Sequence, residues 1–541
     1  HNCITKSISV FLITMRRVKR KFLIVAGLFI SGLNPLWATS SQKITSNIKI
    51  KGDSSKSLSQ SQKKQGVLYE LNSPEDLFLP SRSREVLVKT YQKVNLDQLE
   101  NILINNNRTI KIYLEKVDQA KSILRSSLSS WYPTLNLTAN GIPQYFESNN
   151  YNESSLIQDT SSKQWSSSIS AQIKWDLINP ARVPEIASAR DSFEKSKYSY
   201  SIVLRDLKLE AKKRYFNLQK ANEEIEVAKK SIESSTLGLK DAEIRFESGI
   251  GTKLEVLEAK TQLARDQQLF NIKFGDQKIG QRSLAEILNF PEDVTPLIGS
   301  KTQVTGIWDL SLEDSIIAAY NSREELESIL LDVSINNSNA NAALAASQPK
   351  LSIINTSTSS FAKGELNQIS PNTSNTSSNF SNTIGLNATW FIFDGGNSRS
   401  LYNYNKSKAK EAKLNFAARR AQIRKEVEEV FFKLESAKLN ISASYTEVLS
   451  ARESLRLAKL RYKSGITTQR EVVNNQRDLT DSEVRYIISV TSYNTLLADL
   501  SRQTGLDNIK PCDIKVNQQN QSDIDSKSNL YESNLIPLCQ L

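Results

Sequence analysis

This 541-residue chain contains a single histidine, at position 1. The remaining sequence therefore has no Ser-His-Asp triad, no Cys-His nucleophile pair and no histidine-ligated metal site. It also lacks the glycine patterns of phosphate-binding and dinucleotide-binding loops. Only chemistry built on carboxylates is left open, so we expect no enzyme, no cofactor and no bound metal.

Cysteine is nearly as scarce, with copies only at Cys3, Cys512 and Cys539. The last two lie in a polar C-terminal segment, where they either pair in an oxidising compartment or stay as surface thiols. The sequence leaves both states open.

Long apolar runs are missing too, apart from one near the start. Met15 opens a basic stretch that is followed by the apolar segment FLIVAGLFISGL and the small residue Ala38. This order is typical of a secretory signal peptide, so we assign residues 1–38 to upstream residues and a signal peptide that starts at Met15. A retained anchor helix is the alternative. No later segment reaches about 18 unbroken apolar residues, so we expect no membrane-spanning helix.

The formal net charge is +12, but nearly all of it lies before Val94. The rest of the chain is close to neutral and carries no basic footprint for nucleic acid. Residues 39–93 are rich in Ser, Gln and Lys without sustained periodicity, which indicates a mostly flexible N-terminal arm. Residues 509–541 form a polar C-terminal tail.

What the chain does contain is one segment in two similar copies, 216 residues apart. Residues 242–256 read AEIRFESGIGTKLEV, and residues 458–472 read AKLRYKSGITTQREV. The same offset relates Pro133 to Pro349, more than a hundred residues upstream. An offset held over that distance predicts a duplicated structural unit rather than a shared local motif.

The two repeats are expected at residues 94–290 and 312–508, with a linker at 291–311. Each repeat follows one order: helix, strand, polar loop, strand, very long helix, tight turn and returning helix. In the first repeat, the opening helix is expected over about 95–129 and ends before Pro133. The polar loops are expected at about 144–163 and 363–379.

The very long helices carry the strongest local signal. Apolar or small residues recur at alternating steps of three and four, as at Leu218, Ala221 and Ile225, and the second copy repeats these steps. Such steps predict a heptad seam for packing between helices. The first long helix is expected from about Val183 to Ser248, which at ~1.5 Å per residue makes a rod roughly 100 Å long.

The expected strands alternate between apolar and polar residues. Ile169, Ala171 and Ile173 share one face of a strand, and residues 384–392 alternate in the same way. Behind a signal peptide, strands of about ten residues with one apolar face indicate an outer-membrane barrel with a polar lumen. Four strands are too few to close a barrel, and lipid does not tolerate open edges, so several chains must share it.

Aromatic residues gather at both ends of these strands, as they do at the two borders of a membrane. Ordinary strand-end aromatics in a soluble sandwich are the alternative. The residues assigned to the membrane interface are Trp131, Tyr132, Trp165, Trp175, Trp390 and Phe391.

This plan resembles the TolC-type outer-membrane efflux factor family across about residues 94–508. The resemblance rests on the duplicated R-F/Y-x-S-G-I signature at Arg245–Ile250 and Arg461–Ile466, and on the W-x-I-F-D-G-G corner at Trp390–Gly396. It implies a mainly α protein with a membrane β-barrel: a homotrimer with a twelve-stranded barrel in the outer-membrane lipid and a long α-helical barrel in the periplasm. The implied function is a passive exit duct of a tripartite efflux or type I secretion system.

The resemblance also implies where the duct meets its partners and where it closes. The two helix turns would contact a periplasmic adaptor (membrane fusion) protein, which links to an inner-membrane transporter. The adaptor-contact residues are Gly249, Ile250, Gly251, Thr252, Gly465, Ile466, Thr467 and Thr468. The periplasmic gate residues are Glu471, Asn474, Tyr462, Glu255 and Thr467.

Two gate positions depart from the family pattern. Asn474 leaves one carboxylate per chain in the acidic ring, and Thr467 replaces the arginine that would link to Tyr462 and Glu255. We therefore expect a weaker lock. Glu258 and Arg461 are expected to face water. A secreted coiled-coil scaffold or tether without a pore is the alternative function, and the cargo and the adaptor stay open.

Overall fold

The computed structural model describes residues 87–88, 90–151, 153, 160–366, 374–507 and 509–510. All of them belong to one compact unit, Pro80–Leu541. The expected signal peptide, the expected arm up to residue 86, and the tail with Cys512 and Cys539 lie outside the described residues.

The described chain is mainly helical, and each half runs through the same order of elements: two helices, two long strands, a very long helix and a returning helix. The helices are α3 (Leu96–Asn106), α4 (Arg108–Leu128), the short η3 (Ser129–Trp131), α5 (Arg182–Glu247), α6 (Lys253–Ile287), α7 (Leu312–Ser322), α8 (Glu324–Ala345), α9 (Asn397–Lys463) and α10 (Gln469–Thr504). The strands are β1 (Thr90–Lys93), β2 (Thr134–Asn150), β3 (Thr160–Ile178), β4 (Val294–Leu297), β5 (Ile307–Trp308), β6 (Lys350–Leu366), β7 (Ser374–Thr389) and β8 (Ile509–Lys510).

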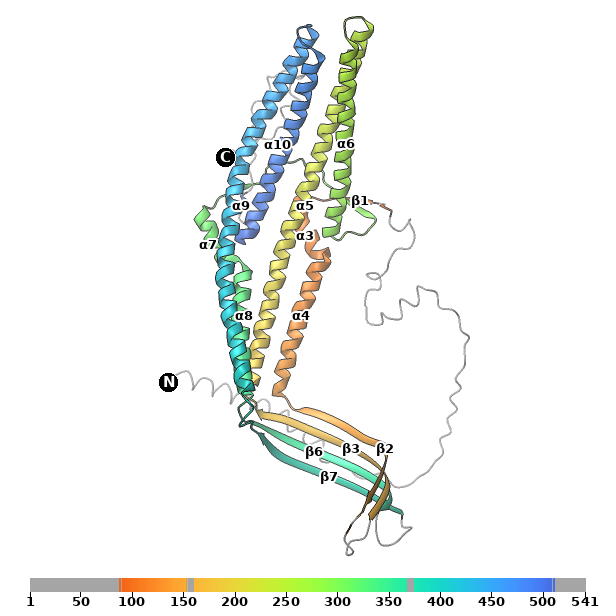
Figure 1. Ribbon diagram of the computed structural model, residues 1–541, viewed down its shortest axis with the longest axis vertical. Helices are drawn as coiled ribbons and strands as arrows, with labels where there is room; N and C mark the ends of the chain where they lie inside the picture. Colours follow the sequence, from red (N-terminus) through yellow and green to blue (C-terminus); the bar gives the residue numbers. More distant parts are fainter. Residues whose placement is uncertain are drawn as a thin grey trace, which may run out of the picture. The chain divides into compact units, whose positions relative to one another are not determined.

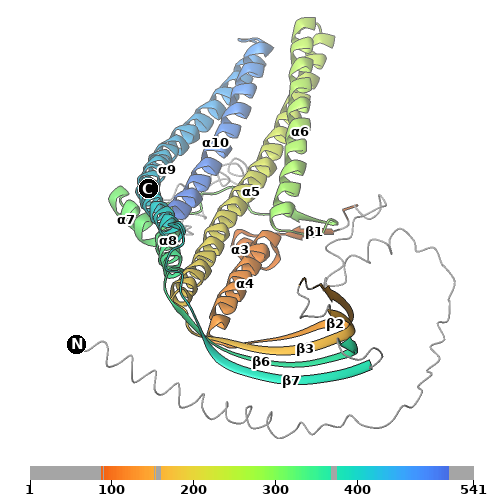
Figure 2. The same cartoon turned by 60° about the horizontal axis from the view of Figure 1, so that its bottom comes forward.

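The predicted rods are present as α5, with 66 residues, and α9, with 67 residues. At ~1.5 Å per residue each is roughly 100 Å long. On α5 the buried side chains include Tyr215, Leu218, Ala221 and Ile225, which follow the predicted steps of three and four. Figures 1 and 2 show that α5 with α6, and α9 with α10, form two helical hairpins.

The single helix expected over 95–129 is instead two helices that meet at Asn107. The Asn107 side chain accepts a hydrogen bond from Ile110 N (3.1 Å) and so caps the start of α4. Its amide donates to Ile287 O (2.7 Å) at the end of α6. The amide therefore ties α6 to the α3–α4 junction, which an unbroken helix could not do.

Strands β2, β3, β6 and β7 form one antiparallel sheet in the order β2-β3-β6-β7, seen side by side in Figure 2. Each strand has 16 to 19 residues, so the predicted length of about ten was too short. The described parts of the loops expected at 144–163 and 363–379 are largely strand; residues 152, 154–159 and 367–373 lie outside the described residues. Their polar composition resembles that of a loop, but the antiparallel ladder satisfies their backbone groups, as where Glu147 lies opposite Lys163.

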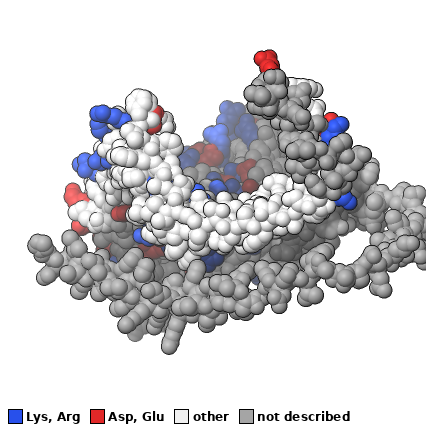
Figure 3. All heavy atoms as spheres, turned by 90° about the horizontal axis from the view of Figure 1, so that it is seen from below, with Lys and Arg blue, Asp and Glu red and all other residues white. Residues whose placement is uncertain are grey.

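The register gives the sheet two chemically different faces. Leu137 lies opposite Ala171, and Ile353 lies opposite Leu386, so apolar partners share one face. The other face carries polar pairs, such as Gln172 with Thr356. Figure 3, seen from below, shows a curved band that is mostly free of Lys, Arg, Asp and Glu. Within the described residues, β2 and β7 each pair along one edge only, which leaves both edges of the sheet open.

Short strands lie in three segments that were expected to be arm, linker and tail. β1 falls in the arm and pairs in parallel with β4 of the linker, while β5 of the linker pairs with β8 of the tail. Each half also has its own apolar core. One core includes Leu99, Tyr215 and Leu284, and the other includes Ile423 and Leu497.

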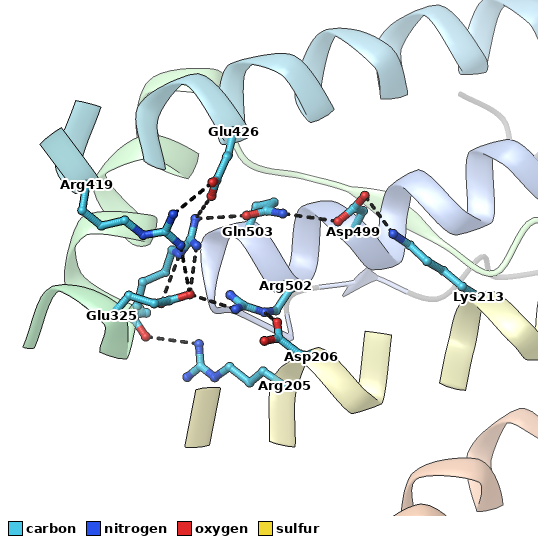
Figure 4. Close-up of polar contacts among 11 residues, drawn as sticks. Arg205, Asp206, Lys213, Glu325, Arg419, Glu426, Asp499, Arg502 and Gln503 are labelled. Carbon is cyan, nitrogen blue, oxygen red and sulfur yellow. Dashed lines mark hydrogen bonds and ion pairs between the residues drawn. The ribbon is translucent and has the colours of Figure 1, made fainter. Parts of the chain in front are cut away.

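A network of ion pairs centred on the nearly buried Arg323, Glu325 and Arg502 joins α5, α8, α9 and α10 (Figure 4). Arg323, whose side chain is 1% exposed, pairs with Glu325 (2.9 Å) and Glu426 (2.7 Å). Arg502 pairs with Glu325 (2.8 Å) and Asp206 (2.6 Å). Burial alone raises the pKa of Glu325, but hydrogen bonds from Arg323 and Arg502 lower it to about 2. These ion pairs therefore hold the four helices together, because each buried charge is compensated by an opposite charge on a neighbouring helix.

Candidate functional site at the helix tips

The turns that close the two hairpins have the same geometry. Gly249 and Gly465 adopt left-handed φ angles of 73° and 72°, which glycine reaches without strain. Gly249 N donates to Phe246 O, and Ile250 N donates to Arg245 O (3.0 Å); the second turn makes the matching bonds. This is a Schellman ending, and it explains the S-G-I of the repeated signature.

Both tips expose a large apolar side chain. Ile250 is 72% exposed and Ile466 is 70% exposed, although the residue at this position of a Schellman turn often packs back on its helix. Leu254, in the first turn of α6, is also exposed. Each tip therefore presents an exposed apolar side chain at the end of its helical hairpin.

The first residues of α6 and α10 use equivalent glutamates differently. Glu255 forms a capping box with Thr252, because its carboxylate accepts from Thr252 N (3.1 Å) and its N–H donates to the Thr252 hydroxyl (3.3 Å). Thr468 makes no such side-chain cap. Glu471 instead accepts from Arg461 (2.9 Å) and from the Thr467 hydroxyl.

Tyr462, predicted to pair with Glu255, is only 7% exposed. Its hydroxyl has no hydrogen-bond partner among the described residues, since the Glu255 carboxylate is held by Thr252. Tyr462 and Glu255 thus make no hydrogen bond within the described chain, and the gate network implied by the resemblance stays a prediction. Burial raises the pKa of Tyr462, the charge of Glu255 raises it further, and Arg245 lowers it. The Arg245 guanidinium lies 4.6 Å from the centre of the Tyr462 ring, a cation–π contact between the two hairpins.

A second cation also links the hairpins at this end. Arg470 of α10 makes an ion pair with Glu258 of α6 (2.6 Å), and Glu258 is mostly buried. The expectation that Glu258 faces water was wrong, because it is mostly buried and pairs with another helix. Arg461 is exposed as expected, with 53% of its side chain accessible, and it also pairs with Glu471. The Asn474 side chain is exposed to solvent.

Arg245, the residue that the sequence reasoning missed, stood inside the quoted signature. Its position corresponds to Arg461 at the 216-residue offset. The two arginines nevertheless contact different partners, Tyr462 and Glu471. Sequence spacing alone could not separate them, because the contact of Arg245 depends on how the first hairpin packs against the second.

The six aromatics expected at the membrane interface are all exposed: Trp131, Tyr132, Trp165, Trp175, Trp390 and Phe391. The Trp175 indole donates to Trp131 O (3.1 Å), and the Trp390 indole donates to Ser347 O (3.0 Å). Both bonds fix a tryptophan where the sheet joins the helices. Trp165 was expected at a loop end but lies within β3, where its ring is 5.2 Å from that of Tyr145.

The described residues contain neither a membrane-spanning helix nor a metal-binding cluster. None of the helices found there has both the length and the apolar character required to span a membrane. Over the same ranges, His, Cys, Asp and Glu side chains nowhere gather in threes as a metal site would require.

The comparison with protein families gives a clear result. The family model described as outer membrane efflux protein matches residues 99–289 and 316–506. The match covers more than half of the chain, so the chain belongs to the outer membrane efflux protein family. No curated protein sequence matches the chain.

Solved structures share the fold. The outer-membrane channel OprN is 16% identical with a TM-score of 0.63, and the match covers 76% of this chain and 89% of that one. The CmeC outer membrane channel of Campylobacter jejuni is 17% identical (TM-score 0.62; 76% and 85% covered). The MtrE outer membrane channel of Neisseria gonorrhoeae, in its open state, is 17% identical (TM-score 0.57; 76% and 89% covered). At such identities the likeness establishes the fold alone.

Proposed function

We propose that this chain is one subunit of an outer-membrane exit duct, a passive conduit for a tripartite efflux or type I secretion system. The observation that carries the proposal is the four-stranded sheet, which has one apolar face and two open edges. Long unpaired edges in water invite aggregation, and in lipid they leave backbone groups unsatisfied. Pairing β2 of one copy with β7 of the next removes both problems.

The dimensions of the sheet support a membrane crossing. Trp165 and Trp175 stand ten residues apart on the same face of β3, about 33 Å along the strand at ~3.3 Å per residue. With the strand tilted by about 45°, this distance becomes a height of about 23 Å. That height matches the apolar band of about 25 Å that outer-membrane barrels present between two aromatic girdles.

Family membership supports a trimer. Three copies supply twelve strands, the number implied by the resemblance to TolC-type proteins, and twelve exceeds the minimum of about eight for closure. The hairpins of the three copies then form a helical tube that extends about 100 Å from the outer membrane into the periplasm. The lumen inherits the polar face of the sheet, with its Ser, Thr, Asn and Gln side chains.

The helix tips are the gate and the docking end in this proposal. Three copies of Glu471 around the axis would attract cations and repel one another. Ile250 and Ile466 offer apolar contacts to a periplasmic adaptor, which would connect the duct to an inner-membrane transporter. Arg245 and Arg470 give each subunit two cationic links that hold its hairpins together, so the missing arginine at Thr467 is offset within the chain.

Planar lipid bilayers test this function. The purified protein is expected to give discrete conductance steps, and a band on unheated gels that shifts on boiling, as β-barrels do. The Tyr462→Ala variant serves as the gating probe, because it removes the ring that Arg245 contacts across the two hairpins. A fully sealed channel that this substitution leaves unchanged would contradict a tip gate. Absence of both conductance and the heat-resistant band would favour the pore-free scaffold.

A further inference from the structure

A cavity of about 450 Å³ lies between the two hairpins near their tips, within the volume range of small-molecule sites. Residues from α5, α6, α9 and α10 line it. Its apolar walls include Leu237, Ile244, Val472 and Val473. The cavity therefore has room for an apolar body such as a fused aromatic ring system.

Two buried hydrogen-bond donors in the lining have no partner among the described residues: the Tyr462 hydroxyl and Arg245 Nε. They are adjacent, since the Arg245 guanidinium lies 4.6 Å from the centre of the Tyr462 ring. Arginine Nε–H can only donate, so whatever satisfies it must be an acceptor. Buried polar groups in folded proteins are nearly always paired, and these two point to a missing acceptor at one place.

The charges around the cavity favour a negative ligand. Arg245, Lys459 and Lys463 line it against one carboxylate, Asp241. Burial and the charge of Lys463 lower the pKa of Lys459, which Asp241 only partly offsets. Two further carboxylates lie nearby and are already bound: Glu255 forms its capping box with Thr252, and Asp266 accepts from the amide of the lining residue Gln262 (2.9 Å).

We propose that this cavity binds a small organic anion, an apolar or aromatic body that carries one carboxylate or sulfonate group. The anionic oxygens accept from Arg245 Nε–H and the Tyr462 hydroxyl, and the body packs against the apolar walls. Such a ligand contacts both hairpins at once, so its binding stabilises the arrangement of the tips seen here. The site belongs to the single chain and does not depend on the proposed duct function.

Isothermal titration of the full-length protein in lipid nanodiscs, with empty nanodiscs as the blank, tests this site. The probes are 2-naphthoate and 2-naphthylmethylammonium, which share one aromatic body and differ in charge. We expect 2-naphthoate to bind at least tenfold more tightly than the ammonium compound.

Variants of the two donor residues test which side chains contact the anionic group. Arg245→Gln is expected to weaken 2-naphthoate binding at least tenfold, and Tyr462→Phe, which keeps the ring, about threefold to tenfold. Arg424→Gln, which removes an exposed arginine of α9 outside the cavity, is the matched control and should bind like wild type. No naphthoate binding, equal affinity for the two probes, or wild-type affinity in both Arg245→Gln and Tyr462→Phe would overturn the proposal. Because conductance needs no ligand here, such a result would leave the duct function untouched.

Discussion

At the scale of single residues, Arg461 and Glu471 form the ion pair that sits closest to the proposed gate. The two side chains are 2.9 Å apart, and the Thr467 hydroxyl also donates to the carboxylate. In the proposed duct, the ion selectivity of the tip would therefore depend on two opposite charges rather than on a carboxylate alone.

Neutralising Glu471 and neutralising Arg461 should shift the ion selectivity in opposite directions. Glu471→Gln leaves Arg461 unbalanced, so the ratio of cation to anion permeability should fall severalfold; Arg461→Gln should raise it. Reversal potentials in a salt gradient measure this ratio. Glu453→Gln, which removes an exposed carboxylate of α9 that pairs with Arg456, is the control. Shifts of equal sign in the two variants would refute the assignment.

The Glu325 cluster makes a prediction about pH. The pKa of Glu325 falls from 4.5 to about 2 on folding, so its stabilisation is fully present above pH 4.5 and is lost as the pH falls toward 2. Glu325→Gln should lower the free energy of unfolding by about 3 kcal/mol at pH 7 and by about 1 kcal/mol at pH 3. Urea unfolding followed by helical circular dichroism measures both values. The exposed Glu429→Gln should change neither, and an equal loss at both pH values would speak against this role for Glu325.

At the scale of elements, the long helices were predictable and the strands only partly so. The α5 seam of Leu218, Ala221 and Ile225 repeats over many turns, and α5 begins and ends within one residue of the expected bounds. The strands continue into Ser-rich and Asn-rich sequence where no apolar alternation marks them. Their length is set by cross-strand pairing, such as Tyr145 with Trp165, which a single sequence does not display.

The turn glycines give a test of the tips. Gly465 has a φ of 72° with no atom near its missing side chain, so Gly465→Ala adds strain of about 1 kcal/mol without a clash. Hydrogen exchange at the end of α9 should become about fivefold faster. Gly275→Ala is the control, because Gly275 lies in α6 with open space around it and alanine favours helix. Unchanged exchange in Gly465→Ala would show that the turn does not limit local opening.

The two faces of β7 give a test of the sheet. Ile384 lies on the apolar face, opposite Asn355, and its neighbour Thr383 lies on the polar face, opposite Thr356. Ile384→Lys should cost about 2–4 kcal/mol if that face meets lipid, whereas Thr383→Lys should be tolerated. The fraction of protein that runs as the heat-resistant band measures the loss. Similar losses in both variants would contradict a lipid-facing side.

At the scale of the whole molecule, the four-stranded sheet with its open edges is the main evidence for a barrel shared by several chains. The apolar alternation around Ile384 predicted strands, and the need to close the barrel predicted several copies. The contacts between the hairpins, such as Arg470 with Glu258, could not be predicted from the sequence, because they join positions 212 residues apart. Helix periodicity states which face packs, but it does not state which partner it packs against.

The most direct measurement is the subunit count of the purified full-length protein, by native mass spectrometry after release from detergent. The account predicts three chains held together, with a heat-sensitive β signal in the same sample. A single chain that stays dispersed in plain buffer, with both sheet edges unpaired, would contradict it.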